Sequence, residues 1–158
     1  MSDDSHVLIS HVPFARELGM RITGGKKGRI EALLPYQDKL IGNPITGVMH
    51  GGAVTAFLDN ICGAAVVSSL DEPVAIATLD LRIDYMRPAA AGEDLRAVTE
   101  VYKKTRQIAF VRGYAYTTDP NDPVAHCTGT FMLAANRAAP VQTPYTSVLE
   151  EARQEQPE

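Results

Sequence analysis

The sequence predicts an α+β domain in which an antiparallel β-sheet wraps around one long central helix. One observation is the segment 50–70, which contains no proline and places apolar residues on every side of a helical wheel. The other is the series of alternating, β-branched segments that follows it at the spacing of β-hairpins. A helix that is apolar all round is buried in a protein core or in a membrane. Because Asp59 lies mid-segment, where a charge costs about 2.5–3.5 kcal/mol in a bilayer, we expect a core helix covered by the sheet.

The remaining elements follow from local patterns along the chain. Apolar spacing predicts a short amphipathic helix over 11–20, and the proline and glycine content of 35–47 is typical of a loop. Strands are predicted over 28–34, 74–86, 94–103, 107–118 and 124–134, with turns at 88–93 and 118–123. The predicted order is therefore one strand, the long helix and then four strands.

Length and composition indicate one domain and exclude several functions. The 158 residues fit a domain at 11–137, an N-terminal tail at 1–10 and a C-terminal tail at 138–158. A net charge of −4 argues against broad binding to nucleic acid or to an anionic membrane. Two cysteines are too few for a disulfide framework, and the N-terminus lacks a signal-peptide pattern, so we expect a cytoplasmic protein. No His, Cys and carboxylate spacing suggests a metal, and no motif suggests a cofactor.

Asp59 is the residue that packing does not explain. An aspartate within a buried helix is rare unless it is paired or functional, and no basic residue lies three or four positions away on the helix. Its same-face neighbours Thr55, Ala56, Cys62 and Gly63 are small, which leaves room for a ligand beside the carboxylate. A hydrogen bond to a loop amide elsewhere in the chain is the alternative interpretation.

The segment Met49–Gly52 marks the start of the helix. The first helical turn has unpaired amides and the positive end of the helix dipole, so it can hold an anion or a developing oxyanion. Glycine lets a carbonyl oxygen approach the backbone closely, which makes Gly51 and Gly52 candidate substrate contacts. Alternatively, the two glycines only fit a tight turn.

The spacing of these two features predicts a dimer. Gly51 and Asp59 are eight residues apart, about 12 Å along a helix axis. An oxyanion donor and a base or nucleophile must both lie close to one carbonyl group, which one helix does not permit. Two antiparallel copies of the helix, related by a two-fold axis, would bring Gly51 of one chain to Asp59 of the other.

Several segments together resemble a known family. They are Asn43–Pro44, Gly47–Gly52, Asp59 nine residues after His50, and Asp84–Pro88. They are similar to the hotdog-fold acyl-CoA thioesterases of the phenylacetic-acid-degradation (PaaI-like) type, over about residues 11–134. This resemblance implies hydrolysis of an acyl- or aryl-acyl-CoA to free acid and CoA, without a cofactor, by a homodimer that commonly pairs again into a tetramer.

The resemblance also implies a role for each matching residue. Asp59 would activate water or attack the thioester carbon, and the Gly51 amide would be the main oxyanion donor. Asn43 would lie near the thioester oxygen or the attacking water, and His50 would shape the loop rather than act as the base. Thr78 matches a serine that helps to place the water, although strand alternation puts it on the side opposite Leu79 and Ile83.

An acidic protein that binds acyl-CoA needs a local basic patch for the phosphates. The candidates are Lys103, Lys104 and Arg106 at one predicted turn, and Arg87 after the Tyr-Met pair; a solvated turn is the alternative for each. Candidate acyl-pocket residues are Ile45, Val54, Phe57 and Leu58, or these are simply core. A second functional hypothesis is a non-catalytic hotdog module that binds acyl-CoA as a sensor or carrier. A hotdog dehydratase is less favoured, because the helix lacks that group's Asp and His spacing.

Overall fold

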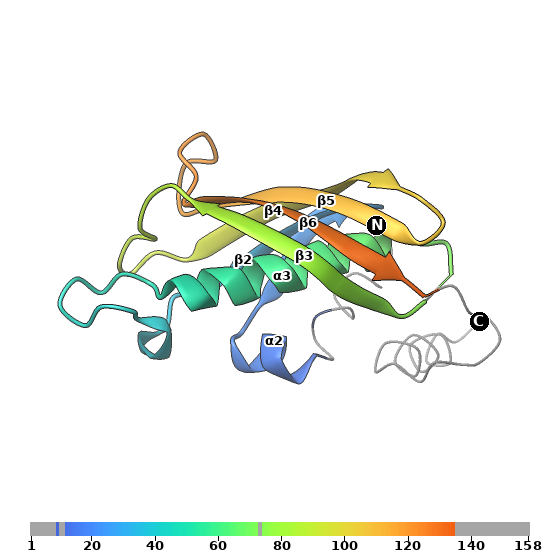
Figure 1. Cartoon of the computed structure of the whole chain (residues 1–158). Helices are drawn as coiled ribbons and strands as arrows, with labels where there is room; N and C mark the ends of the chain where they lie inside the picture. Colours follow the sequence, from blue (N-terminus) through green and yellow to red (C-terminus); the bar gives the residue numbers. More distant parts are fainter. Residues whose placement is uncertain (1–8, 10–11, 73, 135–158) are drawn as a thin grey trace.

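A computed structural model describes residues 9, 12–72 and 74–134. Within them, a six-stranded antiparallel sheet curves over one long helix, α3 (Figure 1). The predicted fold class, a sheet around one central helix, is confirmed. Apart from Ile9, the predicted tails lie outside the described residues, so the domain limits stay a prediction.

The sheet has the strand order β1-β2-β4-β5-β6-β3. The helical elements are α2 (Pro13–Glu17), the 3₁₀ turn η1 (Asp38–Leu40) and α3 (Gly51–Ser68). The strands are β1 (Arg21–Lys26), β2 (Arg29–Leu34), β3 (Ile76–Tyr85), β4 (Leu95–Lys104), β5 (Ile108–Tyr116) and β6 (Ala125–Leu133). The helix and five of these strands lie where the sequence predicts them, whereas α2 is shorter than the predicted helix 11–20.

The prediction of five strands is wrong, because β1 is a sixth. It pairs with β2 in an antiparallel hairpin with a register shift between Ile22 and Gly24. Gly24 and Gly25 lack the branched side chains that identify strands in a sequence, and the backbone of Gly25 has a φ of 137° that side chains rarely adopt. The bulge also breaks the period of two on which the strand prediction rests.

Helix α3 packs its large side chains against the concave face of the sheet. Phe57, Leu58 and Ile61 are fully buried, together with Val54 at the same face. Thr99 on β4, also fully buried, donates a hydrogen bond to the carbonyl of Ile61 over 3.1 Å. By length and composition α3 could cross a membrane, but in this fold it is the core helix. Val54, Phe57 and Leu58 are thus core residues.

The sheet curves around one side of α3, and the other side of the helix is only partly covered within the described residues. Ala56, Asp59, Asn60 and Gly63 are half-buried and share the opposite helix face through their three- and four-residue spacing. The pattern of apolar residues on all sides therefore has two causes. One side meets the sheet, and the other is not fully covered within the described part of a single chain.

β3 forms one edge of the sheet and is largely exposed. It pairs with β6 only, and its exposed apolar side chains include Leu79, at 56% exposure. A ten-residue edge strand presents a row of unpaired backbone groups. The uncovered face of α3 and this edge are adjacent, since α3 and β3 contact one another.

The two cysteines meet in the core as free thiols. Cys62 on α3 and Cys127 on β6 are both buried, with their Sγ atoms 3.7 Å apart. The hydrogen bond to Cys127, followed by burial, raises the pKa of the Cys62 thiol. The same hydrogen bond lowers the pKa of Cys127, assisted by the backbone amide of Gly113.

The packing of β4 against β5 leaves no room for a side chain at Gly113. A Cβ there would lie 2.6 Å from both Thr99 Cγ2 and the Val98 carbonyl oxygen. We therefore expect Gly113→Ala to lower the free energy of unfolding by about 1–3 kcal/mol or more, measured by urea denaturation. The control is Gly24→Ala, where the nearest atom is the flexible end of Glu31 at 3.4 Å. Equal stability of the two variants would contradict this packing.

Candidate active site

The Asp59 carboxylate has a hydroxyl partner from the neighbouring strand. Thr78 Oγ1 on β3 donates a hydrogen bond to Asp59 Oδ1 over 3.0 Å. No ion pair to Asp59 forms among residues 9, 12–72 and 74–134, so no cation of the described chain neutralises it. The sequence also allows a loop amide as the partner of Asp59. In the structure the partner is instead the hydroxyl of Thr78 on strand β3.

Thr78 reaches α3 because of a β-bulge. The register of β3 against β6 shifts between Thr78 and Asp80. The extra residue, Leu79, interrupts the alternation of side chains between the two faces of the strand, so residues before and after it follow opposite patterns. Thr78 pairs with the buried Phe131 and faces the helix. The prediction from simple alternation, that Thr78 points away, is wrong for this reason.

The helix begins at a capped, glycine-rich turn. His50 is the N-cap residue, and its Nδ1 accepts a hydrogen bond from the Gly52 amide over 2.8 Å. The ring therefore caps the first turn of α3, in keeping with the prediction that His50 shapes this segment. A Cβ on Gly52 would lie 2.9 Å from that Nδ1 atom. Position 52 is therefore a glycine because a larger residue would collide with the His50 ring.

The Gly51 amide remains available to a ligand. Gly51 is the first residue of α3, and an amide at that position has no acceptor within the helix. No backbone or side-chain acceptor for it occurs among the described residues. Its peptide therefore offers a free donor at the positive end of the helix dipole.

Three further residues shape this turn, and the sequence analysis gives none of them a role. Tyr85 and Thr55 both donate hydrogen bonds to the Gly51 carbonyl, over 2.8 and 3.1 Å. At Gly42, a Cβ would lie 2.8 Å from the Cα of His50, so the loop passes directly against the cap. Period-two alternation places Tyr85 on the helix side of β3, but nothing in the sequence indicates which part of the helix it meets.

Asn43 belongs to a loop that projects beyond the start of α3 (Figure 1). Its Oδ1 accepts hydrogen bonds from the amides of Ile45 and Thr46 over 2.9 and 3.4 Å, which closes a turn. The Gly47 amide bonds to the Asn43 carbonyl over 2.8 Å. Ile45 stands at the tip with 93% of its surface exposed, so within one chain it lines no pocket.

The structure therefore brings Asp59 to Thr78, and His50 to Gly52, but it keeps the two pairs apart. Gly51 and Asp59 occupy the same helix, about 12 Å from each other along its axis. The carboxylate and the free amide cannot act on one carbonyl group within a single chain.

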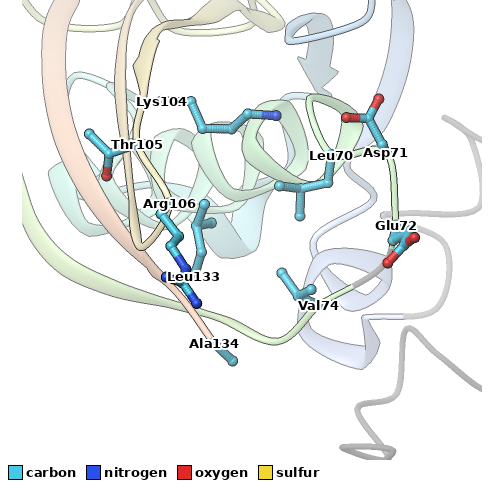
Figure 2. Close-up of a pocket in the computed structure, with 9 residues that line it drawn as sticks. All are labelled: Leu70, Asp71, Glu72, Val74, Lys104, Thr105, Arg106, Leu133 and Ala134. Carbon is cyan, nitrogen blue, oxygen red and sulfur yellow. The ribbon is translucent and has the colours of Figure 1, made fainter. Parts of the chain in front are cut away.

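The predicted basic patch lies at the other end of α3. Lys104 donates a hydrogen bond to the Ser69 carbonyl over 2.7 Å and so caps the end of the helix. A hollow of about 510 Å³ has Lys104, Thr105 and Arg106 on one wall and Asp71 and Glu72 on the opposite wall (Figure 2). Lys103 is exposed near the end of β4 and does not line this hollow.

Charge within the hollow is mixed. The hydrogen bond from Lys27 lowers the pKa of the Asp71 carboxyl, and the charge of Lys104 adds to the effect. Asp71 is paired with Lys27, whereas Arg106 makes no hydrogen bond or ion pair with the described residues. Arg106 is therefore the cation of the hollow with the greatest freedom to bind an anion.

Arg87 is engaged within the chain. Its guanidinium bonds to the Asp122 carbonyl over 2.7 Å, pairs with the Asp122 carboxylate over 2.8 Å, and contacts Pro88 and Thr117. It thereby ties the end of β3 to the turn between β5 and β6. This geometry gives Arg87 a structural role, and its phosphate contact stays a prediction.

No group of His, Cys, Asp and Glu side chains in the part of the chain that the structure describes could hold a metal ion. His126 packs against Tyr114 with 5.8 Å between ring centroids.

Comparison with known proteins defines the class. A family model described as the thioesterase superfamily matches residues 46–124, half of the chain. The match includes Gly51, Asp59 and Thr78, and the sheet over one helix is the hotdog architecture of such proteins. The chain belongs to the thioesterase superfamily.

Individual relatives narrow the resemblance. The medium/long-chain acyl-CoA thioesterase YigI of Escherichia coli is 26% identical over 140 residues, which cover 80% of this chain and 89% of YigI. An esterase candidate of Halobacterium salinarum is 37% identical over 89 residues, but the match spans only 55% of that protein and 54% of this chain. The crystal structure of a phenylacetic acid degradation-related protein from Ralstonia eutropha JMP134 is 30% identical, with a TM-score of 0.67, and covers 77% of this chain and 90% of that one. The PaaI-like resemblance is confirmed, and these relatives are consistent with a thioester hydrolase.

The contacts of Arg87 yield a stability prediction. Arg87→Lys keeps the charge but loses the planar fork that bonds to two turns, so we expect the free energy of unfolding to fall by about 1–2 kcal/mol in urea denaturation. Arg106→Lys, at a residue without such bonds in the described chain, is the matched control. An unchanged stability of Arg87→Lys would show that the guanidinium has another purpose.

Proposed function

We propose that the protein hydrolyses the thioester bond of an acyl-CoA, releasing the free acid and CoA. The observation that carries this proposal is the pair of free groups on α3: a carboxylate that no cation of the described chain neutralises, and an amide that has no acceptor there. A carboxylate and an oxyanion donor are the two groups that attack on a thioester carbonyl needs. Membership of the thioesterase superfamily supports the same reaction.

Each residue then has a chemical task. The Gly51 amide stabilises the oxygen that becomes negative as the thioester carbon is attacked, a contact worth about 3–4 kcal/mol. Asp59 either takes a proton from the attacking water or attacks the carbon itself. In the first case water adds to the carbon and the carbon–sulfur bond breaks. In the second case the carbon–sulfur bond breaks as an anhydride forms between the acyl group and Asp59, and water then hydrolyses that anhydride. In both cases the CoA sulfur leaves and receives a proton. The hydrogen bond from Thr78 holds one carboxylate oxygen and leaves the other for the water or the substrate.

The active unit we propose is a homodimer with two shared sites. Two antiparallel α3 helices would place Asp59 of one chain beside Gly51 of the partner subunit. Support comes from the half-buried α3 face that holds Asp59 and from the exposed edge strand β3 beside it. A second copy would cover both surfaces at once. The PaaI-like resemblance further suggests that two such dimers associate into a tetramer.

The hollow at the end of α3 contains Arg106, which is free to bind an anion, and so it could receive the nucleotide part of the substrate. In the antiparallel arrangement, the end of α3 extends about 15 Å beyond Gly51 of the partner subunit, a distance that an extended pantetheine arm covers. We propose that Arg106 in the hollow and Lys103 near the end of β4 meet CoA phosphates, with Lys104 holding the helix end. A cytoplasmic site of action is part of the proposal, because two cysteines are too few for a disulfide framework.

The test of this function is a hydrolysis assay with short-, medium-, long-chain and aryl acyl-CoAs, in which a dye detects the released thiol. We expect the wild-type protein to release CoA from at least one of these substrates. Asp59→Asn should reduce turnover by about 10³-fold or more, because an amide neither takes a proton nor attacks.

The Asp59→Asn protein should remain folded and associated, because the change is isosteric. Circular dichroism and size-exclusion chromatography check this. Full activity of the folded variant would contradict the role of Asp59. Release from no substrate, with acyl-CoA still bound, would favour the alternative of a non-catalytic sensor or carrier.

A further inference from the structure

Both ends of the Gly51–Gly52 peptide are held by side chains. Its carbonyl oxygen accepts hydrogen bonds from Tyr85 over 2.8 Å and from Thr55 over 3.1 Å. Its N–H group, which belongs to Gly52, donates to His50 Nδ1 over 2.8 Å. The plane of this one peptide is therefore fixed at its oxygen and at its nitrogen.

This peptide contributes to the direction of the Gly51 amide, together with the peptide before it. Gly51 stands between the free N–H group and the held peptide, and a glycine backbone rotates with little steric restriction. The peptide that carries the Gly51 N–H group also has main-chain bonds, because its His50 carbonyl accepts from the Ala53 and Val54 amides over 2.9 and 3.4 Å. Holding the peptide after Gly51 limits the rotation of that residue, so the preceding N–H group keeps one direction.

Tyr85 is the unusual member of this arrangement. A hydroxyl such as Thr55, bonded to the carbonyl four residues before it, is ordinary within a helix. Tyr85 comes instead from the edge strand β3, and its ring covers Gly51 so closely that a Cβ there would lie 3.5 Å from its hydroxyl oxygen. It is 52% exposed, so its hydroxyl could bond to water and needs no protein acceptor.

The two hydroxyl groups also support one another. Thr55 Oγ1 and the Tyr85 hydroxyl oxygen are 2.6 Å apart, so these two groups and the Gly51 carbonyl form a closed triangle. The two hydroxyl protons make two of these three hydrogen bonds at a time, so one hydroxyl can donate to the carbonyl while it accepts from the other. Loss of either hydroxyl should therefore weaken the hold on the same carbonyl.

We infer that Tyr85 is a positioning residue for the oxyanion donor: through the Gly51 carbonyl, it aims the Gly51 amide at the thioester oxygen. The inference rests on the proposed function for its kinetic consequence. Its structural content, that the Tyr85 hydroxyl orients the Gly51 amide, does not depend on turnover.

The kinetic test is Tyr85→Phe, which removes the hydroxyl and keeps the ring. We expect kcat to fall about ten- to a hundredfold with KM within twofold. A misaligned oxyanion donor stabilises the transition state less, whereas binding of the ground-state substrate is little affected. Thr55→Val should lower kcat similarly, Thr55→Ser should restore it, and the double variant Tyr85→Phe/Thr55→Val should lose little more than either alone. The matched control is Tyr102→Phe, at another exposed tyrosine, which should leave kcat unchanged.

A second readout does not need catalysis. In ¹H–¹⁵N spectra of the whole protein, Tyr85→Phe should shift the Gly51 amide resonance, whereas Tyr102→Phe should not. Wild-type kcat together with an unchanged Gly51 resonance in Tyr85→Phe would overturn the inference. If the wild-type protein releases no CoA, the proposed function fails. The Gly51 amide resonance of Tyr85→Phe then tests by itself whether the Tyr85 hydroxyl orients that amide.

Discussion

One rigid helix carries both groups of the proposed active site, and its rise of about 1.5 Å per residue keeps them apart. Gly51 offers its amide at the start of α3, and Asp59 offers its carboxylate a little over two turns later. A helix packed against a sheet does not bend enough to close that distance, because its large side chains are buried in one core. The rest of the proposal follows from this separation, since a second copy of the helix must supply the missing group.

The sheet positions the residues of each chain that the proposed shared site uses. It covers one side of α3 and leaves Asp59 on the other, and the bulge at Leu79 turns Thr78 toward the carboxylate. Edge strand β3 also supplies Tyr85, which reaches across to Gly51. One strand thus contacts both groups of the site, and its free edge lies where a partner chain would extend the sheet.

Patterns within single segments predict much of this structure. The central helix follows from one uninterrupted apolar run, and five strands follow from alternation, because these signals depend on neighbouring residues. Asp59 stands out in the sequence because a lone carboxylate in an apolar helix conflicts with packing. β1 escapes prediction because Gly24 and Gly25 carry no side chains to show the alternation.

Contacts between segments that are distant in the sequence could not be predicted from it. A one-residue bulge reverses the direction of Thr78, and no local signal marks it. Arg87 looks like a phosphate ligand by its charge, yet the turn at Asp122 lies close enough to occupy its guanidinium. The uncovered face of α3 looks, in the sequence, like any other part of a buried helix. In the homodimer proposed here, a partner that is not part of the same chain covers this face.

The central claim is that one working site takes Gly51 from one chain and Asp59 from the other. Gly51→Pro removes the amide hydrogen, and a proline suits the first helical position, since His50 already has an extended ψ of 134°. Alone, Gly51→Pro and Asp59→Asn should both be inactive. When the two variants are refolded together in equal amounts, half of the dimers are mixed and each of these has one intact site, so about a quarter of the wild-type activity should return. Mixed dimers that are detected by native mass spectrometry and remain inactive, beside an active wild-type protein, would contradict the shared site.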